Sequence, residues 1–289
     1  MATRSAKLTR ELPPWLTAVL IFGTMATVAL LEIKRPLRRA KEDKLNRDAR
    51  NLALALVAAA TVSVAEKPVV APLALAVQRN RWGLLNLVRL PVCLELLLSV
   101  VLLDYTLYLW HYLTHRAPLL WRFHRAHHAD LDMDASTALR FHAGELLLSV
   151  PWRAAQIRLL GVSPLGLALW QTLTLMEILF HHANLRLPVA FERLLCRLIV
   201  TPRMHGIHHS TVRQETDSNW STIFSWPDYL HGTLRLNVPQ QRVDIGVPSY
   251  RDPADLSLLK VIELPFRAEP QVAAPVREPL SIPRTTLAN

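Results

Sequence analysis

Long runs of apolar side chains constrain the fold of this 289-residue chain more than any other feature. Residues 14–31 carry no charge over eighteen positions, which is long enough for a membrane-spanning helix. Residues 90–110 form another run, interrupted only by Glu95 and Asp104, and it leads directly into a histidine. The runs predict an all-α integral membrane protein with about four membrane-embedded helices.

Two further apolar regions are broken. Residues 51–65 are apolar until a Glu-Lys-Pro sequence at 66–68, and the run resumes over 69–77. Either a span ends near residue 66 or a broken re-entrant element lies there. Residues 146–180 hold two apolar stretches with arginines and a breaker from Gly161 to Pro164 between them. This pattern predicts a hairpin of two helices rather than one long span.

The basic residues set the expected topology. The formal net charge is +10, and residues 34–50 hold eight Lys or Arg against three acids. By the positive-inside rule this loop is cytoplasmic, and the run over 90–110 then returns to the cytoplasm. Most basic residues flank apolar spans, so a nucleic-acid partner is not expected. Arginine outnumbers lysine 27 to 6, which with the abundant Ala and Leu suggests a GC-rich bacterial genome and an inner-membrane location.

All twelve histidines lie between His111 and His231. Eight of them form three clusters, HxxxH from His111, HxxHH from His124 and a second HxxHH from His205. Spacings of three and four place side chains on one face of a helix, so each cluster can direct its rings at one point. Imidazole is the commonest metal ligand, and eight rings exceed what one ion uses. The clusters therefore predict a dinuclear metal site.

Other metal and redox chemistries fit less well. A zincin protease needs Glu after the first histidine, and Tyr112 stands there. Cys93 and Cys196 are 103 positions apart and give neither a disulfide framework nor an iron–sulfur pattern. The chain shows no nucleotide or haem motif that could carry electrons.

The clusters have companions elsewhere in the sequence: TALRFH at 137–142 followed by Glu145, an HxN at 182–184, and Asp228 before Gly-Thr at 232–233. Together these motifs closely resemble the fatty acid hydroxylase / sterol desaturase superfamily of membrane-bound, histidine-rich non-haem di-iron oxygenases. The resemblance covers residues 90–235. It implies a helical cap on the cytoplasmic side of the membrane helices that houses the dinuclear site.

The resemblance also implies roles for individual residues. It assigns two Fe²⁺ ions, which zinc can replace in purified protein, to nine ligands: His111, His115, His124, His127, His128, His182, His205, His208 and His209. Ligating imidazoles need partners that orient them, and the candidates for contacts around the ligands are Asp104, Asp134, His142, Glu145, His181, Asn184 and His231.

The implied function is that of an O₂-dependent di-iron oxidoreductase that hydroxylates or desaturates a membrane lipid in lipid biosynthesis. The lipid, sterol or fatty acyl, would enter from the bilayer. Two electrons per turnover would come from a ferredoxin or small cytochrome with its reductase. Two alternatives remain open: a histidine-rich metal-binding or metal-transport membrane protein, and a zinc enzyme with the same histidine cage.

Three regions are expected along the chain. Residues 1–90 would hold the N-terminal membrane helices and the basic loop. Residues 91–235 would form the di-iron catalytic domain. Residues 236–289 would be a C-terminal extension with a Pro-rich, disordered tail, since five prolines and no hydrophobic period follow residue 264.

Overall fold

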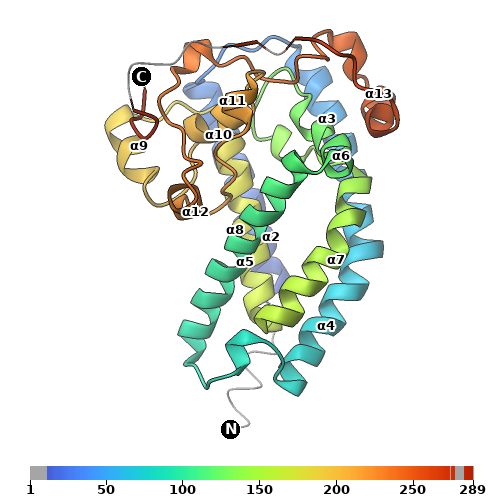
Figure 1. Ribbon diagram of the computed structural model, residues 1–289, viewed down its shortest axis with the longest axis vertical. Helices are drawn as coiled ribbons and strands as arrows, with labels where there is room; N and C mark the ends of the chain where they lie inside the picture. The colour runs from blue at the N-terminus through green and yellow to red at the C-terminus, as the bar shows by residue number, and fades with distance from the viewer. Residues whose placement is uncertain (1–11, 274, 277–282, 289) are drawn as a thin grey trace.

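The computed structural model describes residues 12–273, 275–276 and 283–288. Its regular elements are all helices within this part of the chain, in two layers (Figure 1). Long helices form one end, and short helices and loops form a cap at the other. The predicted all-α membrane fold is confirmed.

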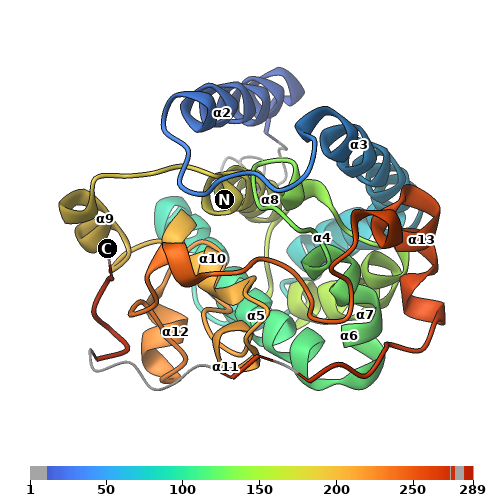
Figure 2. The ribbon, with the colours of Figure 1, turned by 90° about the horizontal axis from the view of Figure 1, so that it is seen from above.

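Three helices of the described chain are long and apolar enough to cross a membrane: Pro14–Lys34, Lys44–Asn86 and Val92–Arg116. The first is α2 and the third is α5. Helix α2 lies at the edge of the bundle beside α8 (Pro164–His182), as Figure 2 shows. Its exposed apolar side chains, Val19 and Phe22 among them, suit contact with lipid.

The interruption at residues 66–68 neither ends the span nor starts a re-entrant loop. Helix α3 (Lys44–Thr61) continues through a π-helical turn, η1 (Val62–Glu66), into α4 (Lys67–Asn80). Pro68 lacks an N–H group and would break a regular α-helix, and a π turn absorbs such a defect. The turn places the buried Glu66 carboxylate 3.8 Å from Arg153 of α7. The sequence signal was correct about an irregularity and wrong about its form.

The predicted hairpin is confirmed as α7 (Ala143–Leu160) and α8. Helix α7 ends at Gly161, whose φ of +78° is the left-handed C-cap conformation that glycine adopts easily. Three residues later α8 begins, with Ser163 as N-cap accepting from Gly166 N and Pro164 in the first turn. Side chains of α4, α5, α7 and α8 form the apolar core of the bundle.

The cap consists of short helices around the end of α5. Helix α6 follows α5 directly, and most of the remaining elements come from the C-terminal half. The elements not yet given are η2 (Leu84–Asn86), α6 (Pro118–His128), η3 (Thr137–Leu139), α9 (Val189–Leu195), α10 (Pro202–His208), α11 (Arg213–Thr216), α12 (Trp226–Leu230), η4 (Gln240–Arg242), η5 (Pro253–Leu256), α13 (Leu258–Glu263) and η6 (Leu264–Phe266).

Residues 274, 277–282 and 289 of the predicted disordered tail lie outside the described residues. The described stretches of this segment have partners in the cap. Glu269 receives a hydrogen bond from Arg125 of α6 at 3.1 Å, and Leu236 N donates to Arg284 O at 2.6 Å. Leu287 is buried in a small apolar cluster with Leu234 and Leu236.

Candidate metal centre

Nine histidines meet in the cap as two adjacent groups. The first group, from α5, α6 and α10, is His111, His115, His124, His128 and His208. The second, from α6, α8 and α10 with its C-cap, is His127, His182, His205 and His209. In each group one ring nitrogen per residue lies within 4.8 Å of the others. His128 and His209, one from each group, stack with ring centroids 4.2 Å apart.

Helical geometry divides each HxxHH cluster between the two groups. His124 and His128 are four residues apart and share the first group, whereas His127, about 100° away around α6, joins the second. The later cluster has the reverse arrangement. His205 and His209 share the second group, and His208 joins the first. Each cluster thus contributes to both groups.

Hydrogen bonds at Nδ1 orient the rings of the first group. Nδ1 of His111 donates to Trp220 O at 2.9 Å, and Nδ1 of His208 donates to Ser218 O at 2.8 Å. Nδ1 of His124 donates to the Glu145 carboxylate at 2.8 Å. A proton held on Nδ1 leaves the lone pair on Nε2, which is how metal-binding histidines are usually prepared.

The buried ring nitrogens fit two metal ions. Nε2 of His124 and of His208 in the first group is buried without a hydrogen-bond partner. In the second group, Nε2 of His182 lies 3.1 Å from Nε2 of His127 and 3.1 Å from that of His205. Nitrogens bound to one ion at about 2.1 Å would lie about 3.0–3.4 Å apart. Buried nitrogens without partners are costly, and metal ions would satisfy them.

The imidazoles are held neutral, as metal ligands must be. Burial lowers the pKa of His208 to about 3. Burial and the neighbouring imidazoles lower the pKa values of His128, His205 and His209 well below the usual value. At neutral pH these rings therefore carry no charge and present a free lone pair.

Of the acids expected to orient imidazoles, Glu145 bonds to a ring of the first group, and two others bond elsewhere. Asp104 accepts from the backbone N–H groups of Ile223 and Phe224 at 3.0 Å each. Asp134 accepts from Arg47 and from Lys44 of α3. Both acids are buried, and their oxygens accept from backbone or cationic donors and not from an imidazole.

The remaining candidates have varied positions. Nδ1 of His181 donates to Thr222 O at 3.2 Å, and its ring lies 4.1 Å from that of His205, outside both groups. His142 caps α7, with Nδ1 accepting from Gly144 N. Asn184 accepts from the backbone N–H groups of residues 37 and 38 in the α2–α3 linker. His231 stacks on Tyr108 at 5.1 Å, away from the groups.

Sequence reasoning missed one feature, an irregular segment at residues 218–222 whose alternate carbonyl groups accept hydrogen bonds from the histidines. Ser218 O, Trp220 O and Thr222 O accept from His208, His111 and His181 respectively. Asp228 of α12 fixes the segment by accepting from Trp220 N and Ser221 N. Every residue has a backbone carbonyl, so the sequence does not mark those that bind histidines. Only Asp228 could have indicated this segment.

Comparison with known proteins locates the same region. Residues 96–233, within the predicted catalytic segment, match the fatty acid hydroxylase family. An ornithine lipid hydroxylase of Rhizobium tropici is 30% identical over 158 residues, which are 54% of this chain and 46% of that protein. A cholesterol 25-hydroxylase-like protein of Danio rerio is 32% identical over 147 residues, 50% of this chain and 57% of that protein.

A cholesterol 25-hydroxylase of Rattus norvegicus is 25% identical over 160 residues, 55% of this chain and 52% of that protein. The chain thus spans about half the length of these curated relatives. No solved structure matches it. The resemblance drawn from the histidine motifs is confirmed. Residues 96–233 are similar to the fatty acid hydroxylase family, and the curated relatives that match lie in the fatty acid hydroxylase/sterol desaturase superfamily.

Proposed function

We propose that this protein is an O₂-dependent lipid hydroxylase whose two histidine groups hold two iron ions. The observation that carries the proposal is the convergence of nine imidazoles, seven buried and two half-buried, in groups of five and four, within a region that matches the fatty acid hydroxylase family. The curated relatives named as lipid hydroxylases support this reaction over desaturation.

The five-histidine group would hold one iron and the four-histidine group the other. When bound, the iron pair supplies the reduction of O₂ and the removal of hydrogen from an unactivated C–H bond. The balanced reaction converts the lipid C–H and O₂, with two electrons and two protons, into C–OH and water.

The chain's own residues prepare and protect the site. Glu145 and the carbonyl of Trp220 keep protons on Nδ1 of His124 and His111, which leaves Nε2 free to bind metal. Phe141 stacks on His127 with ring centroids 4.8 Å apart and covers that ring. Burial excludes water from around the ligands, which protects reactive chemistry from side reactions.

The lipid would reach the site from the bilayer. His111 and His115 lie in the last two turns of α5, the helix whose preceding turns are apolar enough to span a membrane. The eight basic residues at 34–50 favour a cytoplasmic site, which in a bacterium faces the inner membrane's cytoplasmic side. An electron donor of the ferredoxin or small cytochrome class, with its reductase, would dock there.

A zinc enzyme with the same cage is the second candidate, because zinc also binds imidazole. Ligands sited in a folded, buried cap suit a fixed metal centre better than metal transport, which requires ions to be released. Iron content, oxygen uptake and a hydroxylated lipid product separate these functions.

The test uses purified protein from cells grown with iron. We expect two irons per chain, with oxygen uptake stimulated by a reductant and a lipid extract. His127→Ala and His208→Ala should each lower iron content and abolish turnover. His231→Ala is the control, since its ring stacks on Tyr105 and Tyr108 outside both groups. Protein that folds, remains free of any metal and still turns over would refute the proposal.

A further inference from the structure

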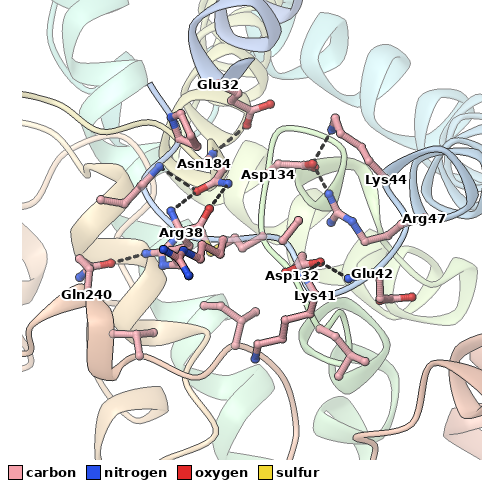
Figure 3. Close-up of a pocket in the computed structure, with 18 of the residues that line it drawn as sticks. Glu32, Arg38, Lys41, Glu42, Lys44, Arg47, Asp132, Asp134, Asn184 and Gln240 are labelled. Atoms are coloured by element: carbon pink, nitrogen blue, oxygen red, sulfur yellow. Dashed lines mark hydrogen bonds and ion pairs between the residues drawn. The ribbon is translucent and has the colours of Figure 1, made fainter. Parts of the chain in front are cut away.

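A cavity of about 950 Å³ lies at the end of α2, and no histidine is among the described residues that line it (Figure 3). Its walls come from the α2–α3 linker, the loop at 131–134, Asn184 and Arg186 after α8, and residues 240–245. Six lining residues are cationic, namely Arg38, Arg39, Lys41, Lys44, Arg47 and Arg186, and four are acidic, namely Glu32, Glu42, Asp132 and Asp134.

The four acids are already engaged by the protein. The Glu32 carboxylate accepts from Ala135 N and Asn184 N. Asp132 accepts from the backbone of residues 41 and 42, and Glu42 pairs with Arg50. Asp134 pairs with Lys44 and Arg47, and these two cations also pair with Asp48 and Asp130 respectively. All four carboxylates therefore already accept hydrogen bonds from the protein, and Glu42 and Asp134 are also paired with cations.

Three arginines are not neutralised in the same way. Arg39 and Arg186 are exposed and make no ion pair within the described part of the chain. Arg38 donates from Nη2 to Gln240 and to Pro202 O, but its Nε and Nη1 are buried without a partner. Burial, with the charge of Arg203, lowers the pKa of Arg38 to about 10, although the charge of Glu192 acts to raise it.

The cavity begins where a membrane span ends. Ile33, in the last turn of α2, lines it and is 75% exposed. Pro36 and Leu37 continue this apolar side, and the arginines follow on the linker. An apolar edge followed by unpaired arginines matches the boundary between acyl chains and anionic headgroups.

From this arrangement we infer that the cavity binds the anionic headgroup, phosphate or carboxylate, of a membrane lipid, with Arg38, Arg39 and Arg186 as its cationic partners. The planar guanidinium group suits these anions because it donates two parallel hydrogen bonds. The lipid chain would leave the cavity past Ile33 along α2.

The site contacts the segments that carry the second histidine group. The Asn184 side chain, two residues after His182, holds the linker backbone at residues 37 and 38. The Arg38 guanidinium lies against Gly206, so closely that a β-carbon there would lie 1.7 Å from Nη2. A headgroup bound by Arg38 would therefore rest on the turn between His205 and His208.

The test measures binding without turnover, so its outcome is independent of the proposed hydroxylation. The full chain in an uncharged detergent is titrated calorimetrically with monomeric dihexanoyl phosphatidic acid. Uncharged dihexanoylglycerol and inorganic phosphate are the comparison probes. The main variant is the double substitution Arg39→Gln with Arg186→Gln, which changes only exposed side chains. Arg213→Gln, 80% exposed on α11 in the cap, is the matched control.

We expect one phosphatidic acid per chain, with binding about 30-fold weaker in the double variant, since each arginine near an anionic lipid contributes about fivefold. Arg213→Gln should bind as wild type does. Arg38→Gln should weaken binding further, and the double variant keeps the test valid if that protein does not fold. Equal binding of dihexanoylglycerol, or unchanged binding in the double variant, would overturn the headgroup site. Inorganic phosphate binding as tightly as the lipid would overturn the lipid as its source.

Discussion

The contact between Glu145 and His124 makes the sharpest prediction about the metal centre. The carboxylate accepts from Nδ1 at 2.8 Å, and both side chains are buried. Loss of a group that orients a metal-binding histidine typically lowers metal affinity 10–100-fold. In Glu145→Gln the amide oxygen can still accept the hydrogen bond from Nδ1–H, so we expect metal affinity to fall about tenfold. In Glu145→Ala the buried N–H loses its acceptor, and we expect about 100-fold, or about 2.7 kcal/mol.

The effect should be confined to one ion, because Glu145 contacts the five-histidine group and not the second group. The measurement is metal release into a chelator, followed by mass spectrometry of the metal retained. Wild type should lose its two ions at similar chelator concentrations, whereas Glu145→Ala should lose one ion at about 100-fold lower concentration.

Glu42→Gln is the control, since Glu42 and Glu145 are each 7% exposed but Glu42 bonds to Arg50. Glu42→Gln should leave the release of both ions as in wild type, apart from any change that a lower melting temperature accounts for. Equal weakening of both ions in Glu145→Ala would mean that the cap as a whole has loosened. Unchanged release of both would show that this carboxylate does not prepare a metal ligand.

Three further predictions test the second group, the cap and the hairpin. His209→Ala should halve the iron content and leave the ion of the first group in place, measured as metal per chain; loss of both ions would contradict two separable groups. Although burial acts to raise it, the charges of Arg140 and Arg47 hold the pKa of Asp130 below its usual range. Its contribution to stability is therefore present above about pH 4 and lost as pH falls further. The melting temperature of Asp130→Asn should accordingly change less with pH than that of wild type. Gly161→Ala should cost about 1–3 kcal/mol, because φ is +78° and a β-carbon would lie 2.5 Å from Trp82 O. Gly23→Ala, inside α2 with nothing within 4 Å of its β-carbon, should melt at the wild-type temperature or above it.

The sequence predicted the long elements well because each has a local cause. The hairpin of α7 and α8 follows from Gly161, Ser163 and Pro164, which end one helix and start the next. The π turn before Lys67 could not be distinguished from a break, because Pro68 disrupts hydrogen bonding in either case. Which form results depends on Glu66 finding Arg153 across the bundle, a contact between residues 87 positions apart.

The histidine spacing was enough to predict that these rings converge but not the assignment of each ring to a group. That His124 and His128 face together follows from helical geometry. That His208 joins them, while His205 and His209 do not, depends on how α10 lies against α5 and α6. Likewise Asp134 is close to the clusters in the sequence, but its partner Arg47 lies 87 residues earlier, so their contact could not be predicted.

Asp104 was expected to orient an imidazole and Asp228 appeared only as part of a motif, yet the structure gives the two aspartates one common role. Asp104 and Asp228 do not accept from imidazoles; they hold backbone N–H groups at residues 220, 221, 223 and 224. The carbonyls of residues 220 and 222 in this stretch, and of residue 218 just before it, then accept from His111, His181 and His208 respectively. Helix α12, which carries Asp228, has five residues and is too short to be stable alone. Two buried carboxylates thus fix a segment that lacks regular structure, and that segment fixes the rings. Removing the charge of Asp104 or of Asp228 should therefore affect metal binding only by shifting the position of this segment.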